Sequence, residues 1–375
     1  MADLAPENYS LEMVKRYNSH FIHDPRTGYF VLDPSTLQVT AKDEKTLREQ
    51  RAAKLAEEYY DFVSPMYEQG WGQRFHYTPM TPGLSIAESM SKYERDFAEI
   101  AGLKKGLKVL DLGCGVGGPA RTLARHIGCE IVGVANNAWL VERGQALTKA
   151  EKLDHLIGFV EGDFMHLPFD NNTFDAAYSF EALCYSPDPA VAYKEAYRVL
   201  KPGGLFAFHD FAMTDKYNDR NPEHRKIKNW IEYGNGIMSM PHVQNMRDGL
   251  KEAGFGSTIF HEEDMSKRSA PAPWYFGPSG NFVWANNWAD FWKVFVMSPF
   301  FLFIANRIYE ILIFFGKKPK EVKMVMDTMW YCCRSVAIGG KRGVFTPLYM
   351  FAARKPGGKD RKGGNVRTAG TDGDV

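Results

Sequence analysis

The chain has 375 residues, which is enough for a sizeable core and for two or three domains. Its 46 basic and 45 acidic residues leave a formal net charge of +1, which argues against a dedicated nucleic-acid-binding protein, where a strongly basic face is expected. The five cysteines show no zinc-type spacing, and the N-terminal stretch lacks an uninterrupted apolar core, so we expect no metal site, no disulfide framework and no signal peptide.

Hydrophobic periodicity predicts a helix over residues 41–62 and a second helix over residues 87–101. From residue 107 onward, short apolar runs alternate with amphipathic stretches. The runs predict strands and the stretches predict helices, namely strands over 107–112, 130–136, 157–164, 174–180 and 204–211, and helices over 119–128, 138–153 and 190–200. Such alternation is typical of βαβ units and of a mostly parallel sheet.

The part of the chain beyond this block is predicted to hold further helices, including residues 242–254, and a last strand over residues 343–356. Residues 291–315 are unusually apolar and about long enough to cross a bilayer, but they include charges that are costly at its centre. We therefore expect an amphipathic element that covers an apolar pocket or dips into a membrane surface, with burial as ordinary core as the alternative. Residues 357–375, rich in glycine and charge, are expected to be disordered.

A glycine-rich loop, Asp111-Leu-Gly-Cys-Gly-Val-Gly-Gly118, follows the first predicted strand of the block and opens a helix. Glycines let a backbone approach a ligand closely, and a helix N-terminus offers unpaired N–H groups. The loop alone is weak evidence, because dinucleotide-binding enzymes carry a similar G-x-G-x-x-G loop. An acid at the start of the loop suits a cationic ligand instead. The form D-x-G-x-G-x-G resembles motif I of class I S-adenosylmethionine-dependent methyltransferases.

This resemblance implies that the loop binds S-adenosylmethionine, which carries an ammonium and a sulfonium group. Later stretches agree with the order of motifs in the family, since Glu161-Gly-Asp-Phe164 and Leu200-Lys-Pro-Gly-Gly204 follow. The acid that usually binds the ribose hydroxyls is replaced by an amide, which can still form these hydrogen bonds. The predicted cofactor-binding residues are Asp111, Gly113, Cys114, Gly115, Gly117, Asn136, Asn137, Asp163 and Phe164.

An aromatic segment upstream of the loop, Tyr67-Glu-Gln-Gly-Trp-Gly-Gln-Arg-Phe-His-Tyr77, has no clear helix or strand period. It resembles the Y-E-x-G-W-G-x-x-F-H-[FY] segment of the sterol 24-C-methyltransferases, and the resemblance covers roughly residues 42–356. It implies methylation of a sterol side-chain double bond through a carbocation. Aromatic faces stabilise desolvated cations by about 2 kcal/mol or more. The rings predicted to contact the substrate are therefore Tyr67, Trp71, Phe75 and Tyr77.

The carbocation must lose a proton, and the candidate catalytic residues are Glu68, His76, Glu181 and Tyr185. A carboxyl in an apolar pocket has a raised pKa, which makes it a better general base near neutral pH. Glu181 follows the fourth strand of the predicted sheet, at the edge where ligands bind in open α/β folds.

Two stretches depart from the family pattern. Family members usually read E-A-T-C-H-A-P where this chain reads Glu181-Ala-Leu-Cys-Tyr-Ser-Pro187, and commonly Y-E-W where it has His209-Asp210-Phe211. His209 and Asp210 are predicted to bind a substrate hydroxyl. The departures leave open whether the acceptor is an ordinary sterol, an already alkylated sterol or another triterpenoid.

The resemblance implies an α/β fold: a Rossmann-like class I methyltransferase domain with a mostly parallel seven-stranded sheet flanked by helices. The expected parts are an N-terminal helical segment with the aromatic segment (1–86), the cofactor-binding core (87–212), a C-terminal α+β cap of the sterol-methyltransferase type (213–356) and the tail (357–375).

The expected partner is a sterol or triterpenoid lipid, and no nucleic acid. For a eukaryotic host we expect peripheral association with the cytosolic face of the endoplasmic reticulum membrane, and otherwise a cytoplasmic or peripheral membrane protein; a homo-oligomer is left open. Two other functions remain open: N- or O-methylation of a small molecule, and lipid binding by a degenerate, non-catalytic methyltransferase fold. The intact glycine loop argues against the second.

Overall fold

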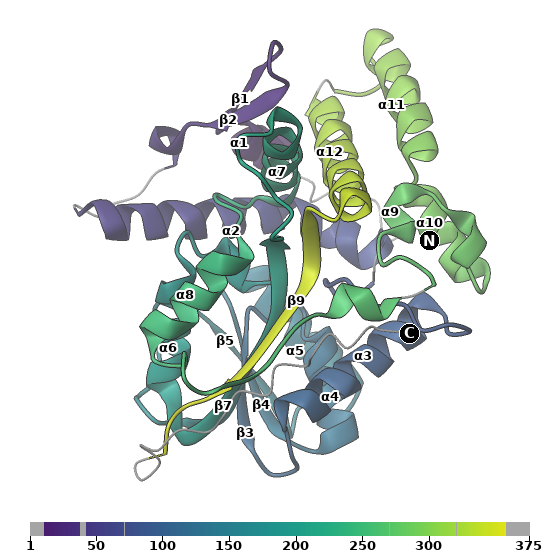
Figure 1. The fold of residues 1–375 in the computed structure, drawn as a ribbon. Coiled ribbons are helices and arrows are strands. Elements are labelled where there is room, and N and C mark those ends of the chain that lie inside the picture. Colours follow the sequence, from purple (N-terminus) through teal and green to yellow (C-terminus); the bar gives the residue numbers. More distant parts are fainter. Residues whose placement is uncertain (1–10, 38–42, 71, 270, 320, 358–375) are drawn as a thin grey trace, which may run out of the picture.

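The computed structural model describes residues 11–37, 43–70, 72–269, 271–319 and 321–357. Its centre is a seven-stranded sheet with the order β5-β4-β3-β6-β7-β9-β8 (Figure 1). The strands are β3 (Lys108–Leu112), β4 (Glu130–Ala135), β5 (Ile157–Glu161), β6 (Phe174–Phe180), β7 (Leu200–Met213), β8 (Ile259–Asp264) and β9 (Phe345–Arg354). The strands from β5 to β7 pair in parallel, and β9 pairs antiparallel with both β7 and β8. The predicted α/β class and the mostly parallel seven-stranded sheet are confirmed.

Helices cover both faces of this sheet. Neighbouring residues of a strand point to opposite sides, so apolar residues of one strand pack against helices on both faces. In β3, Val109 belongs to a buried cluster with side chains of α3 and α4, whereas Leu110 belongs to a cluster with side chains of α6 and α8. A parallel sheet that is buried on both faces in this way is typical of α/β proteins. The flanking helices are α3 (Ile86–Ala101), α4 (Gly118–Ile127), α5 (Ala138–Ala150), α6 (Pro189–Val199) and α8 (Val243–Ala253).

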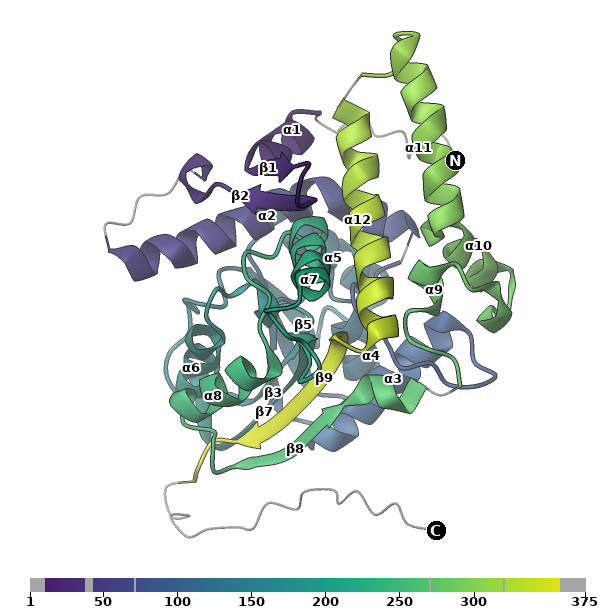
Figure 2. The same ribbon diagram turned by 45° about the horizontal axis from the view of Figure 1, so that its top comes forward.

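A further layer of helices lies across the carboxyl ends of the parallel strands (Figures 1 and 2). It consists of α1 (Leu11–Ser19), α2 (Glu44–Gly70), α7 (Pro222–Asn235) and α12 (Glu321–Arg342), with a hairpin of β1 (Phe21–Asp24) and β2 (Tyr29–Leu32) and the 3-10 turn η1 (Pro34–Thr36). The hairpin packs on α7 through the stacked rings of Phe30 and Tyr233, whose centroids lie 3.6 Å apart. N-terminal and C-terminal parts of the chain thus cover the edge of the sheet where α/β folds bind ligands.

Two apolar helices, α10 (Trp288–Met297) and α11 (Pro299–Phe314), project beside α12 and meet at a bend of 57°. Pro299 suits the first position of a helix, and the hydroxyl of Ser298 accepts a hydrogen bond of 3.1 Å from the N–H of Phe301. Among the described residues, neither helix alone has the length and apolarity to cross a bilayer; only the bent pair, taken together, meets that test. Short elements nearby are η2 (Leu183–Tyr185), η3 (Met265–Ser269), α9 (Phe276–Ser279) and η4 (Phe282–Trp284).

The structure differs from the sequence-based prediction in several elements. Helix α2 continues to Gly70, so Tyr67 and Glu68 lie on its last turn and not on irregular backbone. Helix α1, the β1–β2 hairpin and strand β8 were not predicted. The six residues of β8 include three acidic side chains and are half-buried or exposed, so they lack the apolar run of the other strands. Residues 358–375 of the predicted tail lie outside the described residues.

Candidate active site

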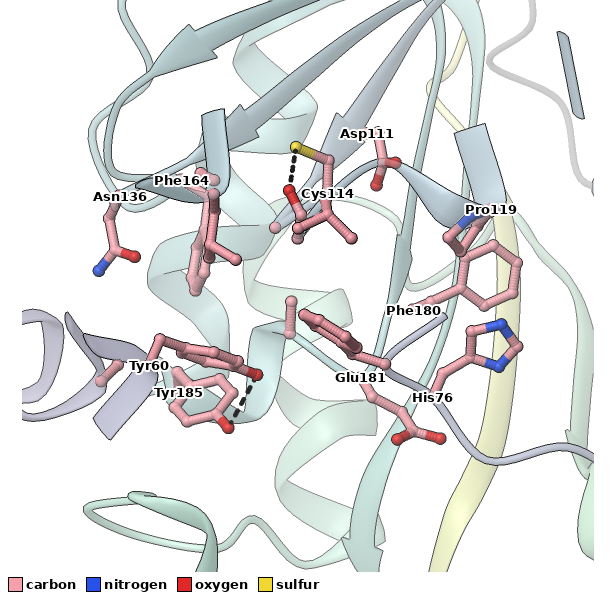
Figure 3. Close-up of a pocket in the computed structure, with 18 of the residues that line it drawn as sticks. Tyr60, His76, Asp111, Cys114, Pro119, Asn136, Phe164, Phe180, Glu181 and Tyr185 are labelled. Atoms are coloured by element: carbon pink, nitrogen blue, oxygen red, sulfur yellow. Dashed lines mark hydrogen bonds between the residues drawn. The ribbon is translucent and has the colours of Figure 1, made fainter. Parts of the chain in front are cut away.

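A cavity of about 850 Å³ lies at the carboxyl ends of β3 and β4, beside the glycine loop (Figure 3). After β3 the chain turns at Gly113 and Gly115, whose φ values of 79° and 52° favour glycine. A Cβ atom on Gly113 would lie 2.2 Å from the Cβ of Ala182, and one on Gly115 would lie 3.4 Å from the ring of Phe75. Backbone therefore forms this part of the wall. We call this space the loop cavity.

Asp111 lies on the wall of the loop cavity with only 2% of its surface exposed. The hydroxyl of Tyr178 donates a hydrogen bond of 2.8 Å to its Oδ2 atom. Burial raises the pKa of Asp111 to about 7, although this hydrogen bond acts in the opposite direction. A cationic ligand would favour the ionised carboxylate, which agrees with the role predicted for the acid of the loop.

Seven of the nine predicted cofactor-binding residues line the loop cavity: Asp111, Gly113, Cys114, Gly115, Asn136, Asp163 and Phe164. The other two, Gly117 and Asn137, are not among the described residues that line it.

Gly117 has a φ of 73° at the N-terminus of α4, where a Cβ atom would lie 2.6 Å from the ring of Phe159. Asn137 accepts a hydrogen bond of 3.2 Å from the N–H of Leu140 at the start of α5, and its amide donates to Asp61 at 2.8 Å. Neither is among the described residues that line the cavity, so both shape the site from behind its wall.

A second cavity of about 1150 Å³ lies between the aromatic segment and the helices α10, α11 and α12. Its walls include Tyr67, Phe75 and Tyr77 of the aromatic segment, Val296, Met297, Phe301 and Leu302 of the α10–α11 bend, and Met326, Met329, Cys332 and Cys333 of α12. Rings and aliphatic or sulfur-containing side chains dominate this lining, as is usual for sites that bind apolar ligands. We call this space the apolar cavity.

The two cavities share one wall, which consists of Tyr60, Phe75, His76, Glu181 and Tyr185. Figure 3 shows Tyr60, Tyr185, Glu181 and His76 below Cys114 of the glycine loop. Because the same side chains face both cavities, a ligand of the loop cavity and a ligand of the apolar cavity meet at this shared wall. A group can pass from one ligand to the other at this place.

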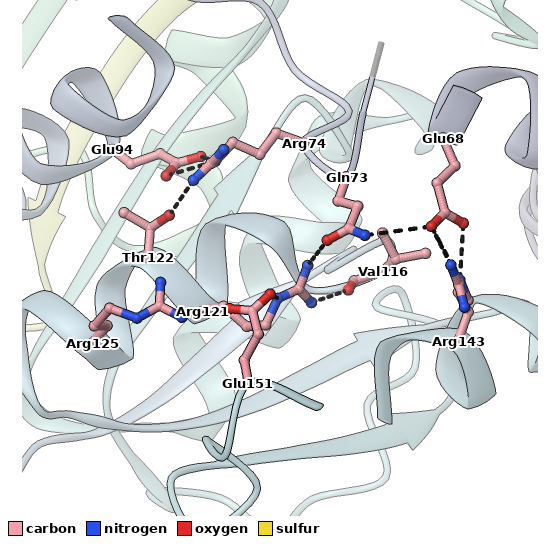
Figure 4. A network of polar contacts seen from close by, with 10 residues as sticks. All are labelled: Glu68, Gln73, Arg74, Glu94, Val116, Arg121, Thr122, Arg125, Arg143 and Glu151. Carbon is pink, nitrogen blue, oxygen red and sulfur yellow. Dashed lines mark hydrogen bonds and ion pairs between the residues drawn. The ribbon is translucent and has the colours of Figure 1, made fainter. Parts of the chain in front are cut away.

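Polar contacts clamp the aromatic segment onto α4 and α3 (Figure 4). Arg121 of α4 donates hydrogen bonds of 2.7 Å to the side-chain oxygen of Gln73 and of 2.6 Å to the carbonyl of Val116 in the glycine loop. The guanidinium of Arg74 lies 2.9 Å from the buried carboxylate of Glu94 on α3. These contacts explain how a segment with two glycines and no regular period holds its rings in defined positions.

Tyr185 connects the shared wall to the covering helices. Its hydroxyl donates a hydrogen bond of 3.0 Å to the carbonyl of Asn235 on α7 and lies 3.1 Å from the hydroxyl of Tyr60 on α2. Burial raises the pKa of Tyr185 and of Tyr60, so both phenols keep their protons at neutral pH. Tyr185 therefore presents a neutral ring to both cavities.

Glu181 directly follows β6 with a φ of 53°, a conformation that is strained for a residue other than glycine. Its carboxyl faces the shared wall, where Oε1 accepts a hydrogen bond of 2.6 Å from the N–H of Tyr77. The Nε2 atom of His209 lies 3.3 Å from the same oxygen. Burial raises the pKa of Glu181, which favours its neutral carboxyl form, and lowers the pKa of His209, which keeps its imidazole neutral at neutral pH.

His76 is engaged at both ring nitrogens. Its Nδ1 lies 2.7 Å from the carbonyl oxygen of Tyr77, and its Nε2 lies 3.0 Å from the carboxylate of Glu94. His76 therefore holds the aromatic segment against α3. The ligand atoms of His76, Glu181 and His209 lie within 4.8 Å of one another, but the same engagement speaks against a metal site there.

The structure argues against three of the predicted roles. Glu68 is not among the described residues that line either cavity, and its carboxylate pairs with Arg143 at 2.9 Å and 3.2 Å, so it is not placed to take a proton from a substrate. His209 and Asp210 are likewise buried behind both walls and not placed to bind a substrate hydroxyl. Asp210 accepts a hydrogen bond of 2.9 Å from the N–H of Cys184 and thereby supports the turn that carries Tyr185. Predicted Trp71 lies outside the described residues.

Sequence analysis missed Tyr60, Asn235 and the α12 residues of the apolar cavity. Tyr60 falls inside the predicted helix 41–62, where its ring reads as one more apolar position. Asn235 ends α7 directly before Gly236, which reads as an ordinary helix end. No pattern in the sequence shows that these residues come together, because the contact depends on how α2, α7 and α12 pack above the sheet.

Comparison with known proteins identifies the family. Residues 110–208 match the methyltransferase domain model, and residues 292–357 match the sterol methyltransferase C-terminal model. The chain is 39% identical over 298 residues to the sterol 24-C-methyltransferase of Kluyveromyces lactis, covering 80% of each chain. It is 38% identical over 317 residues to that of Saccharomyces cerevisiae, covering 84% of this chain and 82% of the relative.

Among solved structures, the mycolic acid cyclopropane synthase CmaA1, complexed with SAH and CTAB, has a TM-score of 0.62 at 14% identity. It covers 81% of this chain and 98% of its own length, and it shares the fold. Fold, cavities and relatives agree: the chain belongs to the sterol 24-C-methyltransferase family.

Proposed function

We propose that this protein transfers a methyl group from S-adenosylmethionine to the side-chain double bond of a sterol, at the C24 position, in sterol biosynthesis. The shared wall carries this proposal, because it brings the loop cavity, whose wall includes the carboxyl of Asp111, into contact with the apolar cavity. Small-molecule N- or O-methylation would not need so large an apolar space. A non-catalytic lipid-binding protein would not need the intact loop.

The loop cavity fits the cofactor in charge and in shape. The buried Asp111 offers a carboxylate to the ammonium group, and the backbone at Gly113 and Gly115 leaves room for close approach. In the family, residues matching Asp163 and Phe164 bind the adenine amino group and pack on its ring, and both line this cavity. When bound, S-adenosylmethionine supplies an electrophilic methyl group.

The chain's own residues then control a cation. The electron pair of the alkene forms the new carbon–carbon bond, which leaves a tertiary carbocation on the neighbouring carbon of the sterol. The rings of Tyr60, Phe75 and Tyr185 face that position from the shared wall, and aromatic faces stabilise a desolvated cation by about 2 kcal/mol or more. Their packing also excludes water, which would otherwise capture the cation as an alcohol. Of the four candidate proton acceptors, Glu181 is the carboxyl on this wall.

The test is incubation of the purified protein with labelled S-adenosylmethionine and a panel of Δ24 sterols, already alkylated sterols and linear triterpenes. We expect the label on carbon of a sterol side chain, located by mass spectrometry. Label on an alkylated sterol alone would keep the chemistry and change the acceptor. Label found only on nitrogen or oxygen acceptors would refute the proposal.

We also propose that the protein docks on a membrane surface through the α10–α11 helices, which in a eukaryotic host would be the cytosolic face of the endoplasmic reticulum. Large apolar side chains of these helices are exposed, with Trp288 at 81% and Phe314 at 84%. Residues at the bend of the same helices line the apolar cavity. A sterol that leaves a bilayer at this surface therefore reaches the cavity without crossing bulk water, which favours a lipid surface as the occupant.

Flotation with phosphatidylcholine–phosphatidylethanolamine vesicles tests the docking. The double variant Trp288→Ser and Phe314→Ser should lower vesicle binding at least about tenfold, because burial of each large apolar side chain contributes on the order of 1 kcal/mol or more. Ile22→Ser is the matched control, since Ile22 is also exposed (62%) but lies on the β1–β2 hairpin. Unchanged binding of the double variant, or an equal loss in the control, would refute docking through this surface.

A further inference from the structure

The β6–β7 pairing holds Glu181 and His209 side by side. In its register, Phe180 lies opposite His209, and the N–H of Glu181 donates a hydrogen bond of 3.0 Å to the carbonyl of His209. The side chains also meet, with Nε2 of His209 at 3.3 Å from Oε1 of Glu181. This Nε2 atom is buried and has no aligned hydrogen-bond partner within the described part of the chain. A buried polar atom in this state is unfavourable, so its position against a carboxyl of the shared wall needs a reason.

The other ring nitrogen of His209 has a partner that permits the tautomer a proton relay needs. Nδ1 lies 2.8 Å from the hydroxyl oxygen of Tyr93, and both side chains are buried. If Nδ1 carries the hydrogen and donates it to Tyr93, Nε2 keeps a lone pair that faces the carboxyl of Glu181. A neutral carboxyl of Glu181 and an unshared electron pair on Nε2 of His209 then form a short path for a proton.

We propose that Glu181 and His209 form a proton relay that quenches the sterol carbocation, an inference that rests on the proposed function. The cation loses a proton from the carbon next to its positive centre, and the electron pair of that C–H bond becomes the new carbon–carbon double bond. One carboxyl oxygen of Glu181 takes this proton. The carboxyl passes its own proton to Nε2 of His209, whose lone pair forms the new N–H bond.

The charges balance in this step. The sterol becomes neutral, Glu181 stays a neutral carboxyl and His209 becomes an imidazolium, so one positive charge moves and none is created in the dry site. The ring of Phe180 lies 4.8 Å from the His209 ring, where its π system favours a cation. Burial and the neighbouring His76 lower the pKa of His209, so the imidazolium returns its proton to the carboxyl of Glu181 once the product has left, and the other carboxyl proton passes to water in the emptied cavity.

The kinetic test compares three variants of the full-length protein: His209→Asn, Tyr93→Phe and the control Phe97→Leu. With a sterol deuterated at the carbon that loses the proton, His209→Asn should lower turnover about 100-fold and show an enlarged primary isotope effect. A larger share of its product should carry a hydroxyl from water, and cofactor affinity measured by calorimetry should stay unchanged. Tyr93→Phe should change the same quantities less, and this variant decides the question if His209→Asn does not fold. The control should keep the wild-type isotope effect.

The kinetic test distinguishes a failure of the proposed function from a failure of the relay alone. A wild type that methylates no sterol refutes the proposed function, and the relay falls with it. A wild type that methylates its sterol, with an unchanged isotope effect and product ratio in His209→Asn and in Tyr93→Phe, refutes the relay alone.

A measurement without turnover checks the same point. Nitrogen-15 NMR of histidine-labelled protein, with His209 identified among the ten histidines by its loss in His209→Asn, should show a neutral ring protonated on Nδ1. A ring protonated on Nε2, or a permanent imidazolium, would overturn the relay.

Discussion

The close approach of the aromatic segment to α4 makes Gly118→Ala a sharp test of the site. A Cβ atom on Gly118 would lie 2.0 Å from the carbonyl oxygen of Gln73 and 2.9 Å from the Cγ of Arg74. Gly118 is the first residue of α4, where alanine suits the helix better than glycine does. Since Cβ atoms essentially never come within 3.0 Å of such neighbours, the backbone at Gln73 must retreat by about 1 Å.

The retreat displaces Phe75 and His76 of the shared wall and Tyr77 of the apolar cavity. A misplacement of about 1 Å can cost about 100-fold in rate, so turnover of a Δ24 sterol should fall about 100-fold. Overpacking typically costs about 1–3 kcal/mol, which corresponds to a fall in Tm of about 1–4 °C for a chain of this length. Cofactor affinity in calorimetry should change much less, because the glycine loop keeps its conformation.

Gly158→Ala is the matched control, since a Cβ atom on this β5 residue would meet nothing within 4 Å. It should keep wild-type turnover. Equal losses of turnover in the two variants, or wild-type turnover of Gly118→Ala, would refute the reasoning that the clamp positions the rings.

Three further predictions concern single carboxylates. Glu94→Gln weakens the ion pair between Glu94 and Arg74, and loss of a buried ion pair of this kind costs about 3 kcal/mol. Calorimetry should therefore show a fall in Tm of about 4 °C. Glu99→Gln is the control, because Glu99 is exposed, and it should leave Tm unchanged. Cofactor binding should strengthen as pH rises through about 7, because the raised pKa of Asp111 keeps its carboxyl protonated below that pH; titrations across this range should lose the slope in Asp111→Asn. Glu68→Gln should lower turnover less than about tenfold, because its partly exposed ion pair is worth about 0.2–1 kcal/mol, whereas Glu181→Gln should lower it about 100-fold. Equal losses in the last pair would restore Glu68 as the proton acceptor.

The sheet and the loop cavity were largely predictable, because their signals are local. Strands β3, β4 and β6 are short apolar runs, and the glycines that follow β3 take conformations that other residues avoid. Gly117 and Asn137 show the limit of such motifs. Both belong to the predicted set, yet one relieves a clash with Phe159 and the other caps α5.

The apolar cavity was predictable only in its aromatic half. The rings of Tyr67, Phe75 and Tyr77 stand in one contiguous segment, whereas Tyr60 and Asn235 reach the cavity from separate helices. Glu68 and Glu181 were equal candidates in the sequence. Only the packing of α5 against the segment reveals that Arg143 neutralises the first, and only the turn after β6 places the second on the shared wall.

The shared wall between the loop cavity and the apolar cavity also has a pharmacological consequence. A compound that joins an adenosine-like head to a flat hydrocarbon body through a linker of a few atoms would occupy both compartments at once. Joining two weak fragments makes the second contact intramolecular, so the conjugate gains affinity without any new contact to the protein. The compound would be selective, because a methyltransferase without the apolar cavity offers no place for its hydrocarbon body to bind.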